Sequence, residues 1–259
     1  MKLPIYQLDV FAENQFHGNP AAVIPLESWI PEETMQKIAS ENSLYETAFF
    51  VKNGDYYDLR WFTPQKESDL CGHATLAAAF VILNHYANLE DRVQFHTSGG
   101  DFEVWHENGL YAMNFPKLEI KRCEMPYELV LGLGKLPKAS YTARDYMLIY
   151  DDEDQILSLD PDIDELRNVQ TCGVIVTAKG VDCDYVLRYF APLMGLNEDP
   201  AAGSAQCMLV PYWAEVLNKK EFVVKQLSRR GGTIYCKDLG DRVQISGKVM
   251  IYLEGSIYI

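Results

Sequence analysis

The sequence lacks a long apolar run and a cluster of basic residues. Its longest apolar run, residues 76–83, is far too short to cross a bilayer, and the opening MKLPIYQLDVF contains no apolar signal core. Lys and Arg number 23 against 37 Asp and Glu, which gives a net charge of −14. Because phosphate binding needs clustered Lys and Arg, this acidic balance argues against nucleic acid as the main partner. We expect a cytoplasmic protein that binds neither membrane nor nucleic acid.

Several chemical motifs are also missing. The six cysteines are scattered and form no C-x-x-C pair, which favours reduced core cysteines over a disulfide framework. There is no P-loop, no H-E-x-x-H and no nucleophile elbow. His17, His85, His96 and His106 have no spacing typical of metal ligands. We therefore expect no metal site.

What the sequence does contain is one phrase written twice. Residues 62–75 read FTPQKESDLCGHAT, and residues 190–205 read FAPLMGLNEDPAAGSA. In both copies a hairpin-like stretch precedes the phrase and an apolar helical stretch follows it. A repeat of this length in two copies indicates duplicated lobes. The predicted fold is α+β, with two pseudo-symmetric lobes over 1–118 and 119–259. Each is a curved, mostly antiparallel sheet around a central apolar helix, and the chain end is free to cross back to the first lobe.

Periodicity and turn signals place the individual elements. A helix is expected to begin at Pro31, and a second one after Asp160, which precedes Pro161 and is the candidate N-cap. The remaining expected elements are strands over 6–12, 21–26 and 145–151, hairpins over 46–64 and 173–192, buried helices over 76–86 and 204–217, and closing meanders over 96–115 and 223–259.

A glycine opens the apolar helix in both copies of the phrase. Gly72 and Gly203 leave backbone N–H groups free at a helix start, where the helix dipole is positive. Two such starts would hold the carboxylate of a small acid even in an acidic protein. The alternative is that the glycines let the helix pack closely against its sheet.

Three polar residues differ between the copies. His73 is either a hydrogen-bonding partner of a substrate or a structural histidine. Asp199 either orients a substrate or caps a helix before Pro200, and Ser204 has the same two interpretations. Their equivalent positions in two repeated lobes favour function.

Glu46 is the sharpest single candidate. It begins the apolar strand ETAFF, and a carboxylate held against apolar surface has a raised pKa, as a general acid–base needs. The alternative is an exposed acid at a strand end. The matching stretch of the second lobe, residues 170–175, contains no carboxylate. The chemistry is therefore expected in one lobe.

The whole chain resembles the phenazine-biosynthesis PhzF-like family, whose relatives are diaminopimelate epimerase and proline racemase. The resemblance rests on DVFAENQFHGNPAAVIPL, ETAFF, LRWFTPQKESDLCGHATLAAA, EDPAAGSAQC and QLSRRGGTIY, spread along the chain in family order. LVPYWAEVL and QLSRRGG are similar to the branch of uncharacterised homologues.

This resemblance implies a diaminopimelate epimerase-like fold, a homodimer and a cofactor-free site in the cleft between the lobes. It implies an isomerase in which Glu46 shuttles a proton, as in the allylic isomerisation of a dihydro-hydroxyanthranilate. The supporting residues that it implies are His73, Asp199 and Ser204, with backbone N–H groups from Gly72 and Gly203. We assign His73 and Asp199 to catalysis and the other three to binding a small anionic carboxylate substrate, and Cys71, Tyr45 and Asn19 are further binding candidates.

Two departures from the family pattern affect the expected pocket. Tyr45 stands where the family usually has Ser, and Ala202 replaces a Thr. The relatives that racemise use two cysteines, but here Cys71 has no counterpart at the second helix start, and Cys207 lies inside the helix. An epimerase that uses Cys71 and a non-catalytic ligand-binding or regulatory protein stay open as alternatives.

Overall fold

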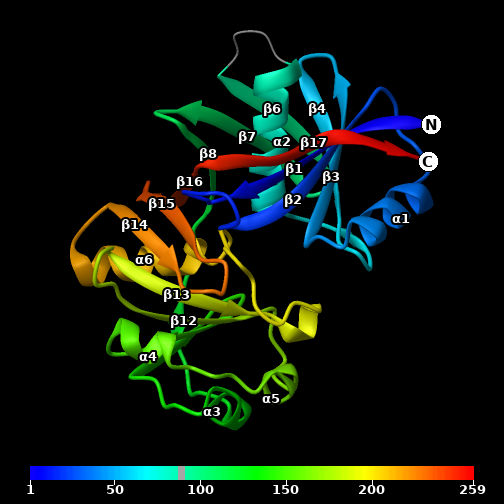
Figure 1. The fold of residues 1–259 in the computed structure, drawn as a ribbon. Coiled ribbons are helices and arrows are strands. Elements are labelled where there is room, and N and C mark those ends of the chain that lie inside the picture. Colours follow the sequence, from blue (N-terminus) through cyan, green and yellow to red (C-terminus); the bar gives the residue numbers. More distant parts are fainter. Residues whose placement is uncertain (87–90) are drawn as a thin grey trace. The chain divides into compact units, whose positions relative to one another are not determined.

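A computed structural model of the protein describes residues 1–86 and 91–259. Its contacts divide the chain into unit 1, residues 1–113 and 246–259, and unit 2, residues 114–245. This division lies slightly before the predicted boundary at 118. The chain end returns to unit 1 because the last strand pairs with the first, Lys2 opposite Tyr258. Figure 1 shows these two strands side by side in blue and red.

Unit 1 is a mostly antiparallel sheet. Neighbours pair in the order β17, β1, β2, β3, β4, β6, β7 and β8, and the pairs β2–β3 and β4–β6 are parallel. A short strand, β5, also pairs with β4. The elements are β1 (Lys2–Val10), β2 (Asn19–Leu26), α1 (Glu32–Asn42), β3 (Glu46–Asn53), β4 (Tyr56–Phe62), β5 (Glu67–Ser68), α2 (Gly72–Val81), the π-helical turn η1 (Ile82–Tyr86), β6 (Arg92–Thr97), β7 (Gly100–Glu107), β8 (Leu110–Pro116) and β17 (Val249–Tyr258).

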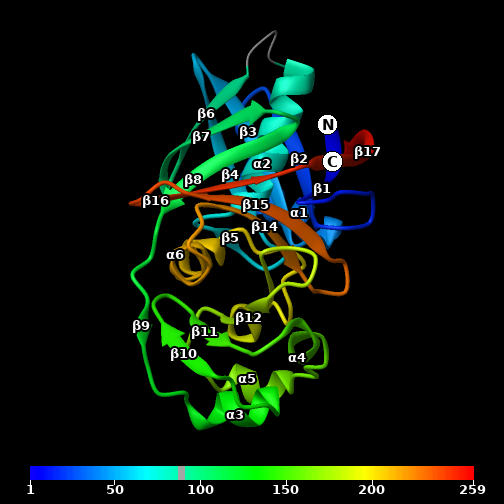
Figure 2. The same ribbon diagram turned by 90° about the vertical axis from the view of Figure 1, so that its left-hand side faces the viewer.

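Helix α2 is the centre of unit 1. Its run of alanines lets strands approach closely, and from Ala74 to Ala79 every side chain is buried. The helix contacts β1, β2, β3, β7 and β17, and Figure 2 shows it among these strands. The predicted buried helix is thus confirmed, and it begins at Gly72. No helix in the described part of the chain is long and apolar enough to cross a membrane.

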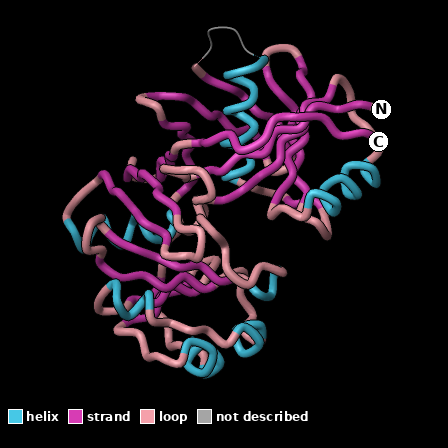
Figure 3. The backbone as a smooth tube through the Cα atoms, viewed as in Figure 1, coloured by secondary structure: helices cyan, strands magenta, loops and turns pink. Residues whose placement is uncertain are grey.

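Unit 2 repeats this strand pattern. Neighbours pair in the order β9, β10, β11, β12, β13, β14 and β15, and the pairs β11–β12 and β13–β14 are parallel. Figure 3 distinguishes its strands from its short helices. The elements are β9 (Lys121–Arg122), α3 (Tyr127–Leu133), β10 (Ala139–Thr142), β11 (Tyr146–Ile149), α4 (Glu153–Leu157), α5 (Ile163–Arg167), β12 (Val174–Lys179), β13 (Tyr185–Phe190), the 3-10 turn η2 (Pro192–Met194), α6 (Gln206–Leu217), β14 (Glu221–Gln226), β15 (Gly232–Asp238) and β16 (Arg242–Gly247), whose end reaches unit 1.

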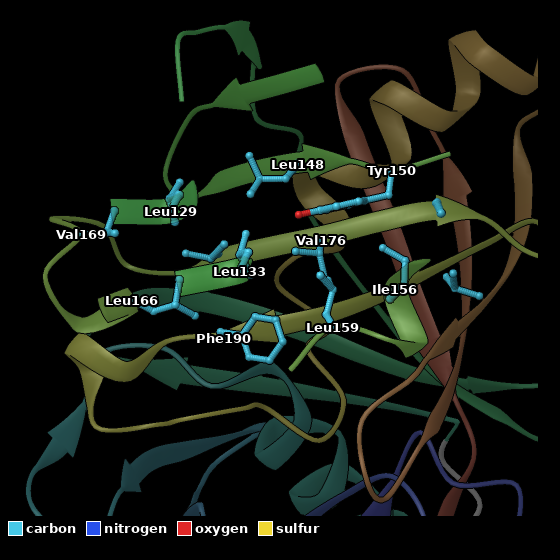
Figure 4. Close-up of a cluster of buried hydrophobic side chains, with 13 residues drawn as sticks. Leu129, Leu133, Leu148, Tyr150, Ile156, Leu159, Leu166, Val169, Val176 and Phe190 are labelled. Atoms are coloured by element: carbon cyan, nitrogen blue, oxygen red, sulfur yellow. The ribbon is translucent and has the colours of Figure 1, made fainter. Parts of the chain in front are cut away.

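The short helices of unit 2 cover one face of β11, β12 and β13. Leu133 and Leu166 from α3 and α5 pack with Val176 and Phe190 from the sheet, all at most 2% exposed (Figure 4). The predicted cap of the second helix was wrong. Asp162 rather than Asp160 accepts the first N–H groups of α5, because the helix begins only at Ile163.

The internal repeat extends to strand register. In unit 1 Thr47 of β3 lies opposite Phe62 of β4. In unit 2 Val174 of β12 lies opposite Phe190 of β13. Since the two phenylalanines begin the repeated phrase, Thr47 corresponds to Val174. Glu46 and Gly173 each come one residue earlier, so they correspond as well.

An arginine–glutamate pair anchors each copy of the phrase. Arg60 donates two hydrogen bonds to Glu67, at 2.6 and 2.7 Å. Arg188 does the same to Glu198, at 2.7 and 3.1 Å. Each guanidinium also lies over the phenylalanine ring two residues further along, at 5.2 and 5.0 Å. Because such bidentate pairs fix geometry as well as charge, each pair ties its strand to the segment that leads to the helix start in its own unit.

Candidate active site

Glu46 begins β3 and is buried, with 8% of its surface exposed. Helix α1 ends before it with Ser43 in the left-handed conformation, at φ 51°. The Asn42 side chain then donates to the Thr47 hydroxyl at 3.2 Å, which fixes the entry into the strand. The interpretation of Glu46 as an exposed strand-end acid is therefore excluded.

Two neighbours define the surroundings of Glu46. The Ser68 hydroxyl donates to Glu46 Oε1 at 2.8 Å, and Ser68 lies on β5 opposite Trp61. Glu46 pairs with Ala21 of the parallel strand β2. Asn19 lies two residues before Ala21 and so on the same sheet face, and 1% of it is exposed. Sequence analysis missed Ser68, although it stands in the repeated phrase at the position of Asp199.

The start of α2 carries free backbone donors. Cys71 is the N-cap, and the Thr75 N–H bonds back to the Cys71 carbonyl at 3.2 Å. The N–H groups of Gly72, His73 and Ala74 therefore have no helical acceptor. With the positive end of the dipole, they form the anion-binding feature that the sequence predicts.

His73 is held neutral. Burial lowers its pKa to about 3. Its Nδ1 lies 3.4 Å from Cys71 Sγ. Its Nε2 is shielded from solvent and has no hydrogen-bond partner in the described part of the chain. A neutral ring can present Nε2 as a donor or an acceptor, depending on which nitrogen carries the proton.

Asp199 is not a helix cap. Its Oδ1 accepts the Ala201 N–H at 2.9 Å within a turn, and α6 begins only at Gln206. Burial raises the pKa of Asp199 to about 7. The carboxyl group can therefore gain or lose a proton near neutral pH.

The loop from Asp199 to Ser204 is clamped by the end of β14. Gln226 Oε1 accepts the Ala202 N–H at 2.7 Å, and Gln226 Nε2 donates to the Asp199 carbonyl. The Ser228 hydroxyl donates to the Pro200 carbonyl at 2.7 Å. Sequence analysis gave Gln226 and Ser228 no role, although both lie in the matched segment QLSRRGG.

The start of α6 repeats the free donors of α2. The Gln206 and Cys207 N–H groups bond to the carbonyls of Gly203 and Ser204, at 3.0 and 3.2 Å. The N–H groups of Gly203, Ser204 and Ala205 have no acceptor within this turn.

An arginine that sequence analysis missed lies at this start. Arg144 donates to the Ser204 hydroxyl at 3.3 Å and to Asp145 at 2.6 Å. The Asp145 side chain is fully buried and accepts a hydrogen bond from the Tyr189 hydroxyl at 3.4 Å. Nothing in the local sequence pairs Arg144 with a residue sixty positions later, so no sequence signal indicated it.

The two cysteines differ in environment. Cys71 is the N-cap of α2, whereas Cys207 is the second residue of α6, and both are buried. Burial raises the pKa of Cys207 to about 11. Its thiolate is therefore scarce at neutral pH, which argues against a second thiol base.

The predicted residues fall into two groups. Unit 1 holds Asn19, Tyr45, Glu46 and the start of α2, and unit 2 holds Asp199 and the start of α6. Tyr45 is 38% exposed directly before Glu46. Within residues 1–86 and 91–259, no group of three His, Cys, Asp or Glu side chains could hold a metal ion.

Comparison with known proteins decides the family. The family model of phenazine biosynthesis-like proteins, PhzC-PhzF, matches residues 8–255. The chain belongs to this phenazine biosynthesis-like family. An uncharacterised isomerase of Pseudomonas aeruginosa is 43% identical over 259 residues and covers 100% of both chains. A PhzF-family phenazine biosynthesis protein of Enterococcus faecalis, whose crystal structure is known, aligns with a TM-score of 0.97 at 43% identity, also over 100% of both chains.

A more distant likeness concerns the fold alone. A hydroxyproline epimerase from Agrobacterium vitis aligns with a TM-score of 0.64 at 8% identity, over 99% of this chain and 92% of that one. The predicted α+β fold of the epimerase type is thus confirmed for this PhzF-like protein. The enzyme class that the comparisons support is an isomerase.

Proposed function

We propose that the protein is a cofactor-independent isomerase of a small carboxylic acid, in which Glu46 moves a proton. The carboxylate of Glu46 takes a proton from a carbon atom, the C–H electron pair shifts a double bond, and Glu46 returns the proton to another carbon of the same molecule. The observation that carries this proposal is the buried Glu46 carboxylate, held by a neutral hydroxyl at 2.8 Å.

The surroundings of Glu46 suit a carboxylate that changes protonation state. A Ser68 hydroxyl can donate to the ionised acid and accept from the protonated one, because it has both a proton and lone pairs. A nearby guanidinium would instead favour the ionised form. At the start of α2, in the same unit, the neutral His73 ring is a further hydrogen-bonding group, and it does not titrate near neutral pH.

The substrate class follows from the two helix starts. Each offers successive backbone N–H groups at the positive end of a helix, which suits a carboxylate. In unit 2, Asp199 precedes the start of α6 and has a pKa of about 7, which allows proton exchange near neutral pH.

Epimerisation by cysteine is the weaker candidate. Cys71 stands at a helix start with His73 Nδ1 at 3.4 Å, which could activate a thiol. Inversion of a carbon needs an acid and a base on opposite faces. The second helix start carries Ala202 in the place of Cys71, and the pKa of Cys207 is about 11. One-face proton transfer by Glu46 fits this arrangement better.

The test follows proton exchange with solvent. The protein is incubated in deuterated water with dihydro-hydroxyanthranilate and a panel of small unsaturated and amino acids, and NMR records product and deuterium uptake. We expect Glu46→Gln to lower uptake by at least about 100-fold, with an unchanged melting temperature. Glu41→Gln, an exposed acid of α1, is the matched control and keeps full activity. Uptake that persists in Glu46→Gln would overturn the proposal.

A further inference from the structure

Arg144 places a charged donor at the start of α6. It comes from the turn before β11, and its Nη2 donates to Ser204 Oγ at 3.3 Å. Its side chain is 36% exposed, so it lies at the edge of the protein interior. The contact joins the turn before β11 to the helix start expected to bind the substrate.

The chemistry of arginine fixes the direction of this hydrogen bond. A guanidinium has five donors and no acceptor, so Ser204 Oγ must accept. The Ser204 hydroxyl proton is then left for another acceptor. No described residue takes it, because Ser204 Oγ has no other hydrogen bond. The free proton lies beside the free N–H groups of Gly203 and Ala205.

The structure holds Arg144 in this orientation through a buried network. Asp145, with a fully buried side chain, accepts from Arg144 Nε at 3.1 Å and from Nη2 at 2.6 Å. The Tyr189 hydroxyl adds a hydrogen bond to Asp145 at 3.4 Å. Gly173 leaves room for the Tyr189 side chain, since a Cβ at position 173 would lie 2.2 Å from the Tyr189 hydroxyl oxygen. The paired Nε and Nη2 contacts set the plane of the guanidinium.

We propose that Arg144 is a positioning residue that directs the Ser204 hydroxyl proton away from the guanidinium, so that the hydroxyl donates to an anionic oxygen of the ligand. The inference rests on the proposed function and deepens it, because it assigns carboxylate selectivity to the start of α6. A carboxylate accepts from both the Ser204 hydroxyl and the backbone N–H groups. A neutral amide group offers one carbonyl acceptor where the carboxylate offers two charged oxygens, and its N–H groups face donors, so it binds more weakly.

A purely structural role predicts something different. If Arg144 only neutralises Asp145, its loss weakens folding and leaves ligand selectivity unchanged. If it acts through Ser204, its effect on binding disappears once the Ser204 hydroxyl is removed. A double-mutant cycle between the two residues separates these cases.

The experiment uses benzoate and benzamide, which share a shape and differ in charge. NMR titration gives the Kd of both for the wild type, Ser204→Ala, Arg144→Met, Arg144→Lys and the Ser204→Ala/Arg144→Met double variant. Arg167→Met removes an exposed positive charge from the same unit and is the control. Thermal melting of every variant reports folding separately.

We expect Arg144→Met to weaken benzoate binding about tenfold, the loss of a charge-assisted hydrogen bond, with benzamide unchanged. In the Ser204→Ala background the same change has little further effect, and Arg144→Lys recovers part of the binding. Arg167→Met matches the wild type.

Additive effects of the two substitutions, or equal losses for benzoate and benzamide, would overturn the role of Arg144 and leave the Glu46 mechanism standing. Failure of the wild type to prefer benzoate over benzamide would overturn the inference as well. A coupled cycle without proton exchange on any compound would instead support the inference and count against the proposed isomerase.

Discussion

Each unit has one carboxylate at an equivalent pair of positions on two parallel strands. In unit 1 the second strand of the pair carries it, and in unit 2 the first strand does. In unit 1 the pair is Ala21 and Glu46, on the parallel strands β2 and β3. In unit 2 the register of β11 and β12 makes Asp145 and Gly173 the corresponding pair. Glu46 bonds to a neutral hydroxyl, whereas Asp145 is locked to Arg144. The comparison teaches that a duplicated frame holds a carboxylate in two electrostatic settings, beside a neutral hydroxyl in unit 1 and beside a guanidinium in unit 2.

The starts of α2 and α6 also share a backbone feature and differ in their side chains. Gly72 and Gly203 open equivalent turns with free N–H groups, so the backbone feature is shared. The side chain after each glycine differs, since His73 follows the first and Ser204 the second. The neutral imidazole suits hydrogen-bond exchange with a reacting molecule, and the serine beside Arg144 suits a fixed anion.

The largest difference between the units should appear at the repeated arginines. Arg188 is 13% exposed and also donates to the Leu159 carbonyl at 2.7 Å, whereas Arg60 is 29% exposed. Arg188→Met leaves the half-buried Glu198 and the Leu159 carbonyl without their partner and should lower the free energy of unfolding by about 3 kcal/mol. For Arg60→Met we expect about 1 kcal/mol. Chemical denaturation measures both, and equal losses would contradict the ranking.

A smaller effect is expected at Gly173, which is the counterpart of Glu46 in unit 2. In Gly173→Ala the new methyl group displaces the buried Tyr189 ring, whose hydroxyl oxygen lies 2.2 Å from the Cβ position. Overpacking of this kind lowers stability by about 1–3 kcal/mol. Gly255→Ala in β17 meets nothing closer than 3.7 Å and should change stability by less than about 0.5 kcal/mol. Denaturation curves of the two variants should therefore separate clearly. Superimposable curves would refute the close packing at Gly173.

A further difference concerns pH. The pKa of Asp199 is raised by burial from 3.8 to about 7, so the folded state holds this proton more tightly than the unfolded state. Its contribution to stability is full below about pH 4 and declines as the pH rises to about 7. The Asp199→Asn variant has no carboxyl group to titrate, so its stability does not show this decline. The melting temperature of the wild type minus that of the variant should therefore fall between these pH values.

The pKa of His73 is shifted in the opposite direction, but its effect cancels when the melting temperatures of the wild type and Asp199→Asn are subtracted. Its pKa is lowered to about 3, so its contribution to stability grows with pH up to its ordinary value of 6.5. Both proteins carry His73, and the difference between their melting temperatures isolates Asp199. A difference that stays constant or rises with pH would show that the carboxyl group does not titrate in this range.

The sequence predicted what local patterns determine. Alternating hairpins, the small apolar helix and the repeated phrase follow from residue spacing, and the structure confirms them in β3–β4, α2 and the corresponding elements of unit 2. The misplaced cap at Asp160 shows the limit of such patterns, since two aspartates flanked Pro161 and the side-chain geometry selected Asp162.

The residues that the sequence could not supply come from strand register. Ser68 reaches Glu46 because β5 folds back onto β4, and Gln226 reaches the Asp199 loop from the end of β14. Arg144 meets Ser204 across sixty residues of chain. Contacts of this kind depend on tertiary packing rather than on spacing. The homodimer, the cytoplasmic location and the catalytic roles of the site residues stay predictions.

The central claim is that one carboxylate in unit 1 carries the proton. The direct measurement compares solvent deuterium uptake by Glu46→Gln and Cys71→Ser in the same NMR assay, with dihydro-hydroxyanthranilate and the panel of small acids. The account predicts loss of uptake in Glu46→Gln and uptake within about threefold of the wild type in Cys71→Ser, since losing a catalytic group lowers a rate about 100-fold or more. Uptake that survives in Glu46→Gln and vanishes in Cys71→Ser would contradict the account and assign the chemistry to a thiol.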